Sequence, residues 1–341
     1  MADVLEHEAR ALLTAKAVRA RAGQMLDIGL SGGLTHFTFD LDRMDGVADA
    51  VLDVTRKAYP TLDIPFHARW RHFVFGGLDR WAQLAGATSW PDRAARARAE
   101  FDLAIVSVLL DAGAGATWRY RDAVTGQGIG RSEGLALASL DMFAGGLFDH
   151  IAAQANDGSI PAPTILSAVL NQLGSIWPSR LELAGVPLGD CWRHPAIKAE
   201  DTTAGLVPLH KLSQWLSYSL IEPLQRAGFE VTDIDGLTGL AEYRNGGLFV
   251  DHGVLRLRDA ADADRAHAVD SLLVVEWRAL TVALLDRVAE RVRAKLGRTP
   301  QSLPLASILE GGTWAAGRAI AFARRPDGSP PLKVISDGTV F

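Results

Sequence analysis

The sequence predicts a mainly α-helical globular protein, and three observations lead to this prediction. Apolar residues recur at intervals of three and four along most of the chain, which is the spacing of one face of a helix. Strand-like runs are few. The 341 residues are 48% hydrophobic and 22% charged, enough to bury a large core. We therefore expect a multi-helix body that carries small β-hairpins.

The helical spacing is clearest in seven segments, at residues 4–22, 47–58, 93–110, 133–153, 165–176, 211–226 and 261–296. Two segments beside glycine-rich turns, 247–257 and 332–341, read as strands. The stretch 156–163 is rich in Pro, Gly and Asp and is the clearest connector. It predicts an N-terminal helical part, 1–155, and a C-terminal helical part, 156–341, which form one compact unit with a shared site.

Composition excludes several classes of function. The net charge of −5 provides no basic field for a nucleic-acid backbone. A single cysteine, Cys191, excludes a disulfide framework and fits a reducing compartment. The first residues mix both charge signs, unlike a signal peptide, and the most apolar stretch, 103–110, is far shorter than the roughly 20 residues of a membrane span. We expect a cytoplasmic protein without a membrane segment; the oligomeric state stays open.

The densest polar motifs lie between residues 207 and 253. Lys211, Gln214, Tyr218 and Glu222 fall on one helix face with Trp215 beside them. This pattern is typical of a binding site inside an apolar surrounding. The alternative is a solvated face with an ordinary Lys/Glu ladder.

A second motif follows on the same stretch. Glu242, Tyr243, Arg244 and Asn245 are consecutive and precede two glycines, which let backbone approach a ligand closely. The alternative is a charged turn that leads into a hairpin, and one segment can be both. Asp251, further along, is another candidate contact for a substrate.

His67, Arg69, Trp70, Arg71 and His72 form a further cluster. Arginine forks bind phosphate or carboxylate, and tryptophan stacks on a base or a sugar. The alternative places Trp70 in the core and the charges at the surface. The two histidines are badly spaced for a metal and no third ligand is apparent, so we predict no metal site.

Small residues after the helix at 93–110 can expose backbone N–H groups to an anion, with Arg119 and Arg131 nearby, and we count Asp111 among the substrate-binding candidates. The glycines at 126–130 do not complete a dinucleotide fingerprint, and we expect no cofactor. Internal ion pairs are the expected explanation for most residues of a last group: Arg180, Asp190, Trp192, Arg193, His194, Glu276 and Arg278.

Taken together, these strings resemble the uracil-catabolism family typified by the fourth protein of the Urc pathway, long catalogued as a domain of unknown function. The resemblance runs almost end to end, through HARWRHF, VSVLLDAGAG, WRY, RSEGLALAS, IWPSR, LGDCWRHP, HKLSQWLSYSLIEP, LTGLAEYRNGG, EWRALTV, GGTWAAGR and SDGTVF. It implies a step in a pathway that opens the uracil ring after attachment to ribose, and whose ribosylurea-type intermediate must release urea. Members of the family carry several dozen more residues near 142–146.

A fainter resemblance links the chain to queuosine-salvage N-glycosylases, which have a helical fold like that of DNA glycosylases. It centres on the HK-x-x-Q helix and the A-E-Y-R turn, and it matches Lys211 to their lysine and Glu242 to their aspartate. The resemblance implies hydrolysis of an N-ribosyl bond in a small-molecule substrate, free or as its 5′-phosphate. Glu242 would stabilise an oxocarbenium-like ribose, and Lys211 would keep that carboxylate ionised or protonate the leaving group.

Other readings remain open. Asp235 and Asp251 are weaker candidates for a second carboxylate, because turn capping explains each equally well. An amidohydrolase that cuts the urea carbonyl would need metal ligands or a nucleophile motif, which the sequence lacks. The chain could instead be a non-catalytic ligand-binding or scaffold protein of the pathway, or an N-glycosylase that acts on a modified nucleoside 5′-phosphate.

Overall fold

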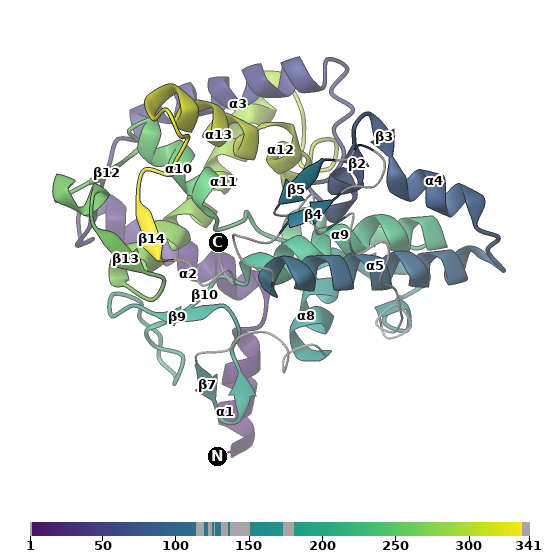
Figure 1. Ribbon diagram of the computed structural model, residues 1–341. Helices are drawn as coiled ribbons and strands as arrows, with labels where there is room; N and C mark the ends of the chain where they lie inside the picture. Colours follow the sequence, from purple (N-terminus) through teal and green to yellow (C-terminus); the bar gives the residue numbers. More distant parts are fainter. Residues whose placement is uncertain are drawn as a thin grey trace.

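A computed structural model describes residues 2–113, 119–121, 125, 127–130, 136, 151–172 and 181–335. Most of these residues are helical and every described sheet has two strands, so the prediction of a mainly α protein is confirmed (Figure 1). The helices are α1 (Ala2–Ala11), α2 (Ala15–Leu30), α3 (Met44–Ala58), α4 (Arg80–Ala87), α5 (Arg93–Gly113), α8 (Ala162–Gln172), α9 (Lys211–Ala227), α10 (Tyr243–Asp251), α11 (Leu272–Leu296), α12 (Leu305–Ile308) and α13 (Trp314–Arg324). Shorter helical turns are η1 (Leu41–Arg43), η2 (Arg69–Phe73), η3 (Ile234–Gly236), η4 (Ala260–Ala263) and the π-helical turn η5 (Leu309–Thr313).

The described strands are short, with two or three residues each. They are β1 (Phe37–Phe39), β2 (Val74–Phe75), β3 (Leu78–Asp79), β4 (Arg119–Arg121), β5 (Gly128–Gly130), β6 (Ser159–Pro161), β7 (Glu182–Leu183), β8 (Val186–Pro187), β9 (Cys191–Arg193), β10 (Leu206–Pro208), β11 (Glu230–Thr232), β12 (Leu255–Leu257), β13 (Ala266–Ala268) and β14 (Lys333–Ile335).

The expectation of small hairpins is right only in part. Strands β2–β3, β4–β5, β7–β8 and β9–β10 are antiparallel neighbours in the sequence. In contrast, β1 pairs with the distant β12, and the pairs β6–β11 and β13–β14 are parallel. Parallel partners need a long crossover, which the intervening helices provide.

The predicted helices at 47–58, 93–110 and 211–226 match α3, α5 and α9. The predicted helix at 4–22 divides into α1 and α2, because the Thr14 hydroxyl caps a new helix by accepting a hydrogen bond from Ala17 N. The helix expected at 261–296 begins only at Leu272, where Ser271 is the N-cap. Most of the predicted helix at 133–153, and the end of the one at 165–176, lie outside the described residues.

The predicted strand at 247–257 is wrong, since α10 extends to Asp251 and only Leu255–Leu257 is a strand. Two contacts explain the helix. Glu242 caps its first turn, and Gly246 packs so closely on Trp277 that a Cβ there would lie 2.7 Å from the indole. Tertiary packing therefore overrides the low helix propensity of the two glycines.

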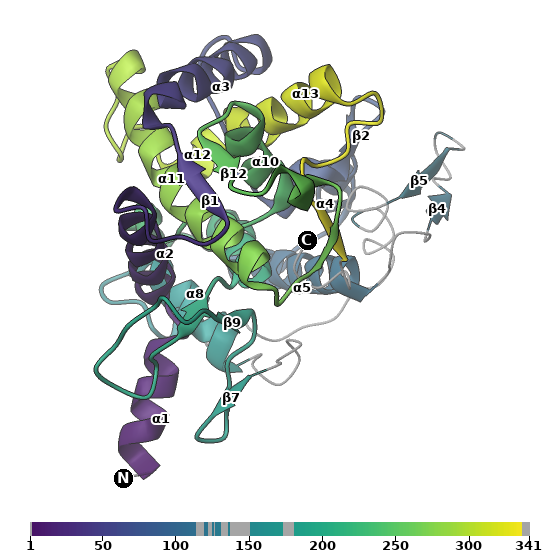
Figure 2. The ribbon, with the colours of Figure 1, turned by 90° about the vertical axis from the view of Figure 1, so that its left-hand side faces the viewer.

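Helices α2, α3, α10 and α11 form the larger helical group, and α11 is its central element. Its apolar side chains are buried from Leu273 to Val292, and α2, α3 and α10 pack around it (Figures 1 and 2). In the neighbouring group, α9 packs between α5 and α8. Helices from both predicted parts of the chain thus pack on each other; the boundary at residue 155 stays a prediction. No helix in the described ranges is both long and apolar enough to cross a membrane.

Candidate active site around Glu242 and Lys211

Glu242 is the N-cap of helix α10. Its carboxylate accepts hydrogen bonds from the backbone N–H groups of Arg244, at 2.7 Å, and Asn245, at 2.5 Å. The residue is 7% exposed. Shorter side chains usually occupy the N-cap position. Here the longer carboxylate of Glu242 lies at the positive end of the helix dipole.

The positive charges that act on Glu242 do so without direct contact. In the described part of the chain it forms no ion pair within 4.0 Å. Burial raises the pKa of this carboxyl group above its ordinary value, while the two backbone N–H groups and the nearby charges of Lys211 and His67 oppose the rise. The structure therefore brings together the AEYR segment, the HKLSQ helix and the histidine that begins the 67–72 cluster.

Lys211 is the first residue of α9 and is half-buried. The Asp190 carboxylate accepts a hydrogen bond from its backbone N–H at 2.9 Å, and the preceding residue, His210, has a left-handed backbone with φ of 48°. The Asp190 carbonyl accepts hydrogen bonds from Leu209 N and His210 N. These contacts hold a strained turn in place and set the start of the helix.

Four of the residues assigned to internal ion pairs form two close pairs, Arg278 with Asp190 and His194 with Glu276, whereas Arg193 is exposed. Arg278 binds Asp190 through two bonds of 2.8 Å, and His194 lies 3.2 Å from Glu276. Burial alone would raise the pKa of Asp190. The charge of Arg278, together with the hydrogen bonds that the Asp190 carboxylate accepts, instead holds this pKa well below its usual range. Arg180 lies outside the described residues.

Gln214 and Tyr218 face inward on α9, so the alternative of a solvated ladder is wrong for them. Both amide atoms of Gln214 bind Thr238, and the Tyr218 hydroxyl donates to the Thr238 carbonyl at 2.9 Å. Their hydrogen bonds dock the loop that leads to Glu242. A direct contact with substrate stays a prediction for both residues.

His67 lies beside the carboxylate of Glu310, a residue that no local motif of the sequence indicates. Its Nδ1 is 2.7 Å from Glu310 Oε2, and the Tyr59 hydroxyl donates to Glu310 Oε1 at 3.1 Å. Burial and the Glu310 charge raise the pKa of Tyr59 to about 12, so this phenol stays protonated at neutral pH. His67 Nε2 has no hydrogen-bond partner among the described residues and is not buried, so it remains available to a substrate.

Glu310 projects from the π-helical turn η5, which packs on α3. A Cβ at Gly312 would lie 2.5 Å from the Val51 carbonyl oxygen, so this close approach requires glycine. π-Helical turns are frequent at functional sites. The sequence signal was the GG pair that follows Glu310, and it gave no indication of a π turn.

The other members of the 67–72 cluster have mixed environments. Arg71 binds Glu222 at 2.6 Å, and Trp70 Nε1 donates to the Ser219 carbonyl at 2.7 Å. Arg69 is fully buried, and its guanidinium lies over the Trp215 ring at 4.5 Å. The core reading is therefore right for Trp70, whereas a surface position for Arg69 is wrong.

His72 packs edge-on against Trp215, with ring centroids 5.5 Å apart. Burial, followed by the charges of Arg69, His67 and Arg71, lowers its pKa well below the ordinary value. His72 is therefore neutral at physiological pH and adds no positive charge for a phosphate. The indole N–H of Trp215 is buried without a hydrogen-bond partner among the described residues.

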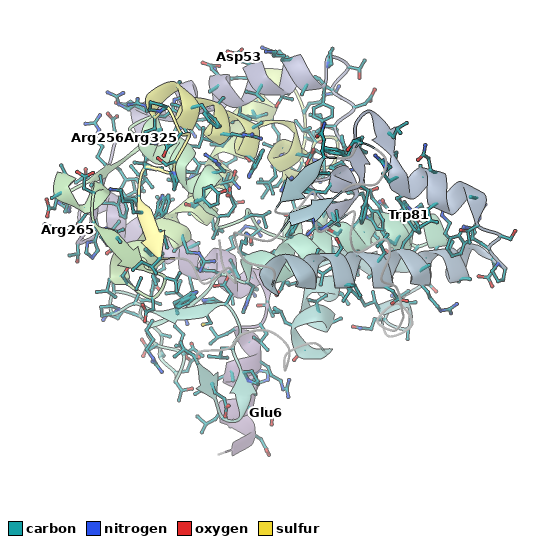
Figure 3. All side chains as sticks on the ribbon, viewed as in Figure 1. Glu6, Asp53, Trp81, Arg256, Arg265 and Arg325 are labelled. Atoms are coloured by element: carbon teal, nitrogen blue, oxygen red, sulfur yellow. The ribbon has the colours of Figure 1, made fainter. Side chains whose placement is uncertain are left out.

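Trp81, on the adjacent helix α4, extends this aromatic group (Figure 3). Its ring centroid is 6.0 Å from that of Trp70, and its Nε1 donates to Glu100 on α5 at 3.1 Å. Trp70 and Trp81 thus link η2 to α4, and the hydrogen bond to Glu100 links α4 to α5.

Asp251 ends helix α10, opposite Glu242. Its carboxylate accepts two hydrogen bonds from Arg325, at 2.8 and 2.6 Å (Arg325 is labelled in Figure 3). Asp235, the other weak candidate, accepts hydrogen bonds from Arg293 and from Leu305 N. Both carboxylates are thus engaged in holding segments together.

Arg244 and the Asn245 Nδ2 group also have partners, whereas Asn245 Oδ1 is buried without one among the described residues. Arg244 donates to the Gly328 carbonyl at 2.6 Å and lies over the Tyr243 ring at 4.9 Å. Asn245 Nδ2 donates to the Leu240 carbonyl at 3.3 Å. The side chain of Asp111 and residue Arg131 lie outside the described part of the structure, so their predicted roles stay predictions.

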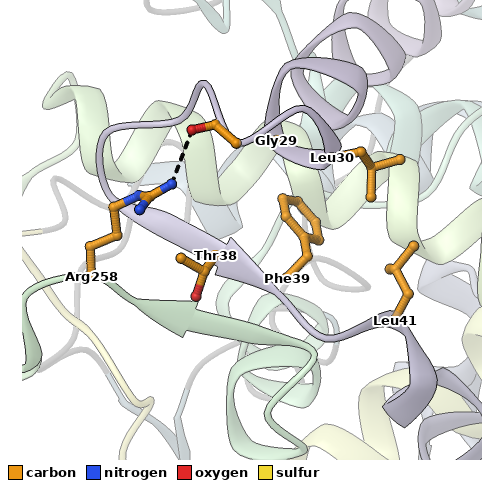
Figure 4. A pocket seen from close by; sticks show the side chains of 7 residues that line it. Gly29, Leu30, Thr38, Phe39, Leu41 and Arg258 are labelled. Atoms are coloured by element: carbon orange, nitrogen blue, oxygen red, sulfur yellow. Dashed lines mark hydrogen bonds between the residues drawn. The ribbon is translucent and has the colours of Figure 1, made fainter.

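A surface pocket elsewhere shares no residue with this site. It is lined by Gly29, Leu30, Gly32, Thr38, Phe39, Leu41 and Arg258 (Figure 4). The Arg258 guanidinium donates to the carbonyl of Gly32 at 3.1 Å. Among the described side chains, no three or more His, Cys, Asp or Glu residues gather in a way that could hold a metal ion.

Comparison with known proteins connects nine tenths or more of the chain to each of two fungal relatives. It is 36% identical to Protein urg3 of Schizosaccharomyces pombe over 406 aligned residues, which cover 97% of this chain and 98% of that protein. It is 33% identical to Uracil catabolism protein 4 of Lachancea kluyveri over 407 residues, which cover 90% of this chain and 92% of that protein. Both alignments are longer than the 341 residues of this chain, so each relative has additional internal residues.

A family model described as "Protein of unknown function (DUF1688)" matches residues 11–157 and 144–341. The two matched stretches meet in the region where family members were expected to carry an additional segment. The family model covers nearly the whole chain, which shows that the chain belongs to this DUF1688 family.

Proposed function

We propose that this protein acts in uracil catabolism by hydrolysing the N-ribosyl bond of a ribosylurea-type intermediate, which releases urea. The observation that carries the proposal is a nearly buried carboxylate, Glu242, that has no ion pair in the described structure but lies within electrostatic reach of Lys211 and His67. The name of one relative, Uracil catabolism protein 4, supports the pathway. A carboxylate of this kind suits a reaction with a cationic ribose.

In the proposed reaction, the bond between ribose C1′ and the urea nitrogen breaks and its electron pair stays on nitrogen. Glu242 stabilises the positive charge that develops on the ribose and accepts a proton from the water that adds to C1′. His67, in its imidazolium form with Nδ1–H on Glu310, donates the Nε2 proton to the leaving nitrogen. The proton that Glu242 took from water then returns to His67 before the next turnover. The sum is one water consumed, with ribose and intact urea formed.

Each supporting group has a defined task. Lys211 favours the ionised form of Glu242 despite its burial. Glu310 holds His67 through Nδ1, so that Nε2 is the nitrogen that faces a substrate. Lys211 and His67 are half-buried, which keeps them accessible to a small molecule.

The phosphate clamp expected from the arginines receives less support. Arg71 is paired with Glu222, and Arg244 with the Gly328 carbonyl. The substrate is therefore tested in both forms, free and as the 5′-phosphate.

The test is incubation of the purified protein with ribosylurea and with ribosylurea 5′-phosphate, followed by NMR. We expect intact urea and the free sugar, with the reaction lost in Glu242→Gln. The matched control is Asp251→Asn, which removes a carboxylate charge from the other end of α10. Ammonia and carbon dioxide as products would indicate cleavage of the urea carbonyl instead. Binding of substrate without any release would favour a scaffold role.

A further inference from the structure

Arg278 connects the two chain segments that carry the candidate catalytic residues. Its Nη1 and Nη2 each donate to the Asp190 carboxylate at 2.8 Å, and its Nε donates to the Ala241 carbonyl at 3.1 Å. Asp190 in turn binds the backbone N–H of Lys211, and Ala241 directly precedes Glu242. One guanidinium therefore lies between the backbone of Lys211 and the backbone of Glu242.

The connection is short and rigid. Arg278 is 1% exposed and projects from α11, the helix at the centre of the larger helical group. Trp192 is the third residue that donates to the Asp190 carboxylate, after Arg278 and Lys211, and its Nε1 does so at 2.6 Å. A planar fork bound at all three nitrogens has little freedom to rotate, so the positions of its two partners are fixed relative to each other.

We infer that Arg278 is a positioning residue, which sets the separation of the Glu242 carboxylate and the Lys211 ammonium by holding both segments on α11. The role in turnover rests on the proposed function, but the geometric role does not. Lysine in place of arginine keeps the charge but places its donors on a single nitrogen, so it loses the planar fork that binds Asp190 through two nitrogens and Ala241 through the third.

Helix α11 also offers a matched control. Glu276, two residues earlier, is fully buried and pairs with His194, which follows the strand β9. Its carboxylate also accepts hydrogen bonds from Thr35 N and His36 N, and it has no contact with the segments of Lys211 or Glu242 among its hydrogen bonds. Glu276→Gln therefore perturbs a buried polar network on the same helix without touching the connection.

The experiment measures how strongly Lys211 and Glu242 sense each other. The titration of the Glu242 carboxyl is followed by ¹³C NMR on glutamate-labelled full-length protein, with Glu242→Gln used to assign the signal. In the otherwise native chain, Lys211→Met raises the pKa of Glu242, because it removes a favourable positive charge. The same Lys211→Met change is then made in the Arg278→Lys and Glu276→Gln backgrounds.

We expect the shift caused by Lys211→Met to be clearly smaller in Arg278→Lys than in the native chain, and to be unchanged in Glu276→Gln. Thermal denaturation of both variants identifies a loss that comes from unfolding alone. An equal shift in all three backgrounds overturns the inference, whether or not the protein releases urea. If urea release is observed, Arg278→Lys is expected to lower kcat about 10²-fold with a change in KM below about threefold, as expected when reacting groups are displaced by an ångström.

Discussion

The two ends of helix α10 carry two acidic residues in different electrostatic situations. Asp251, at the C-terminal end, is bound by both nitrogens of the Arg325 fork, and its charge is neutralised by direct contact. Glu242, at the N-terminal end, is held by two backbone N–H groups and has no ion pair among the described residues. A carboxylate that is oriented but not directly neutralised can respond to a charge that develops on a substrate, whereas a carboxylate in a bidentate ion pair stabilises the fold.

The largest expected effect tests the catalytic end of this comparison. Glu242→Gln keeps the size and a hydrogen-bond acceptor but removes the charge. We expect the rate of urea release to fall about 10³-fold, since electrostatic stabilisation of this kind contributes on the order of 10²- to 10³-fold. The measurement is kcat by NMR at saturating substrate. A rate within about threefold of the native enzyme would remove Glu242 from the mechanism.

The next effect tests the structural end. Asp251→Asn removes the charged partner of Arg325 at a position where the Asp251 side chain is buried. We expect the free energy of unfolding to fall by about 3 kcal/mol, as when one member of a largely buried ion pair is removed. Urea denaturation measures this change. Turnover per folded molecule should be nearly native, and a selective loss of turnover would contradict the division of roles between the two ends of α10.

A third prediction sharpens the comparison at His67, whose charge acts on Glu242. His67→Gln removes the proposed proton donor, and we expect kcat to fall about 10²-fold, at the lower end for general acid catalysis. Glu310→Gln still accepts a hydrogen bond from His67 Nδ1, so its loss should be about tenfold. A substrate with a more acidic leaving nitrogen needs less proton donation. Equal losses on that substrate and on ribosylurea would argue against the role of His67.

The smallest effect concerns stability against pH. The folded protein has a raised pKa at Glu242, so it binds this proton more tightly than the unfolded chain does. The contribution to stability is fully present below the unfolded pKa of about 4.3 and is lost as pH rises through the raised folded pKa. Glu242→Gln does not titrate. We therefore expect the Tm of the native protein to fall relative to that of the variant as pH rises from about 4 through the raised pKa of Glu242. A difference in Tm that is independent of pH would contradict the raised pKa.

Sequence reasoning selected two polar segments that the structure links. The motif on α9 was selected from its spacing and the motif at the start of α10 from its density of polar residues. Gln214 and Tyr218 of α9 bind Thr238 in the loop that leads to α10, and the catalytic role of the two motifs stays a prediction. Sequence reasoning mistook α10 for a strand, because its two glycines and the apolar run after them resemble a hairpin. It also missed Glu310, which lies 243 residues from its partner His67 along the chain. No local pattern can indicate such a pair.

By itself, the sequence determined the helical class, through apolar periodicity, and the family, through strings that extend along nearly the whole chain. Only the tertiary structure decided which polar residues remain available for chemistry. Gln214, Tyr218 and Asp251 became contacts of the fold, while Glu242 and His67 did not use all of their polar capacity. The physical reason is that spacing along one helix fixes which residues share a face, but the partners that neutralise them come from segments distant in the sequence.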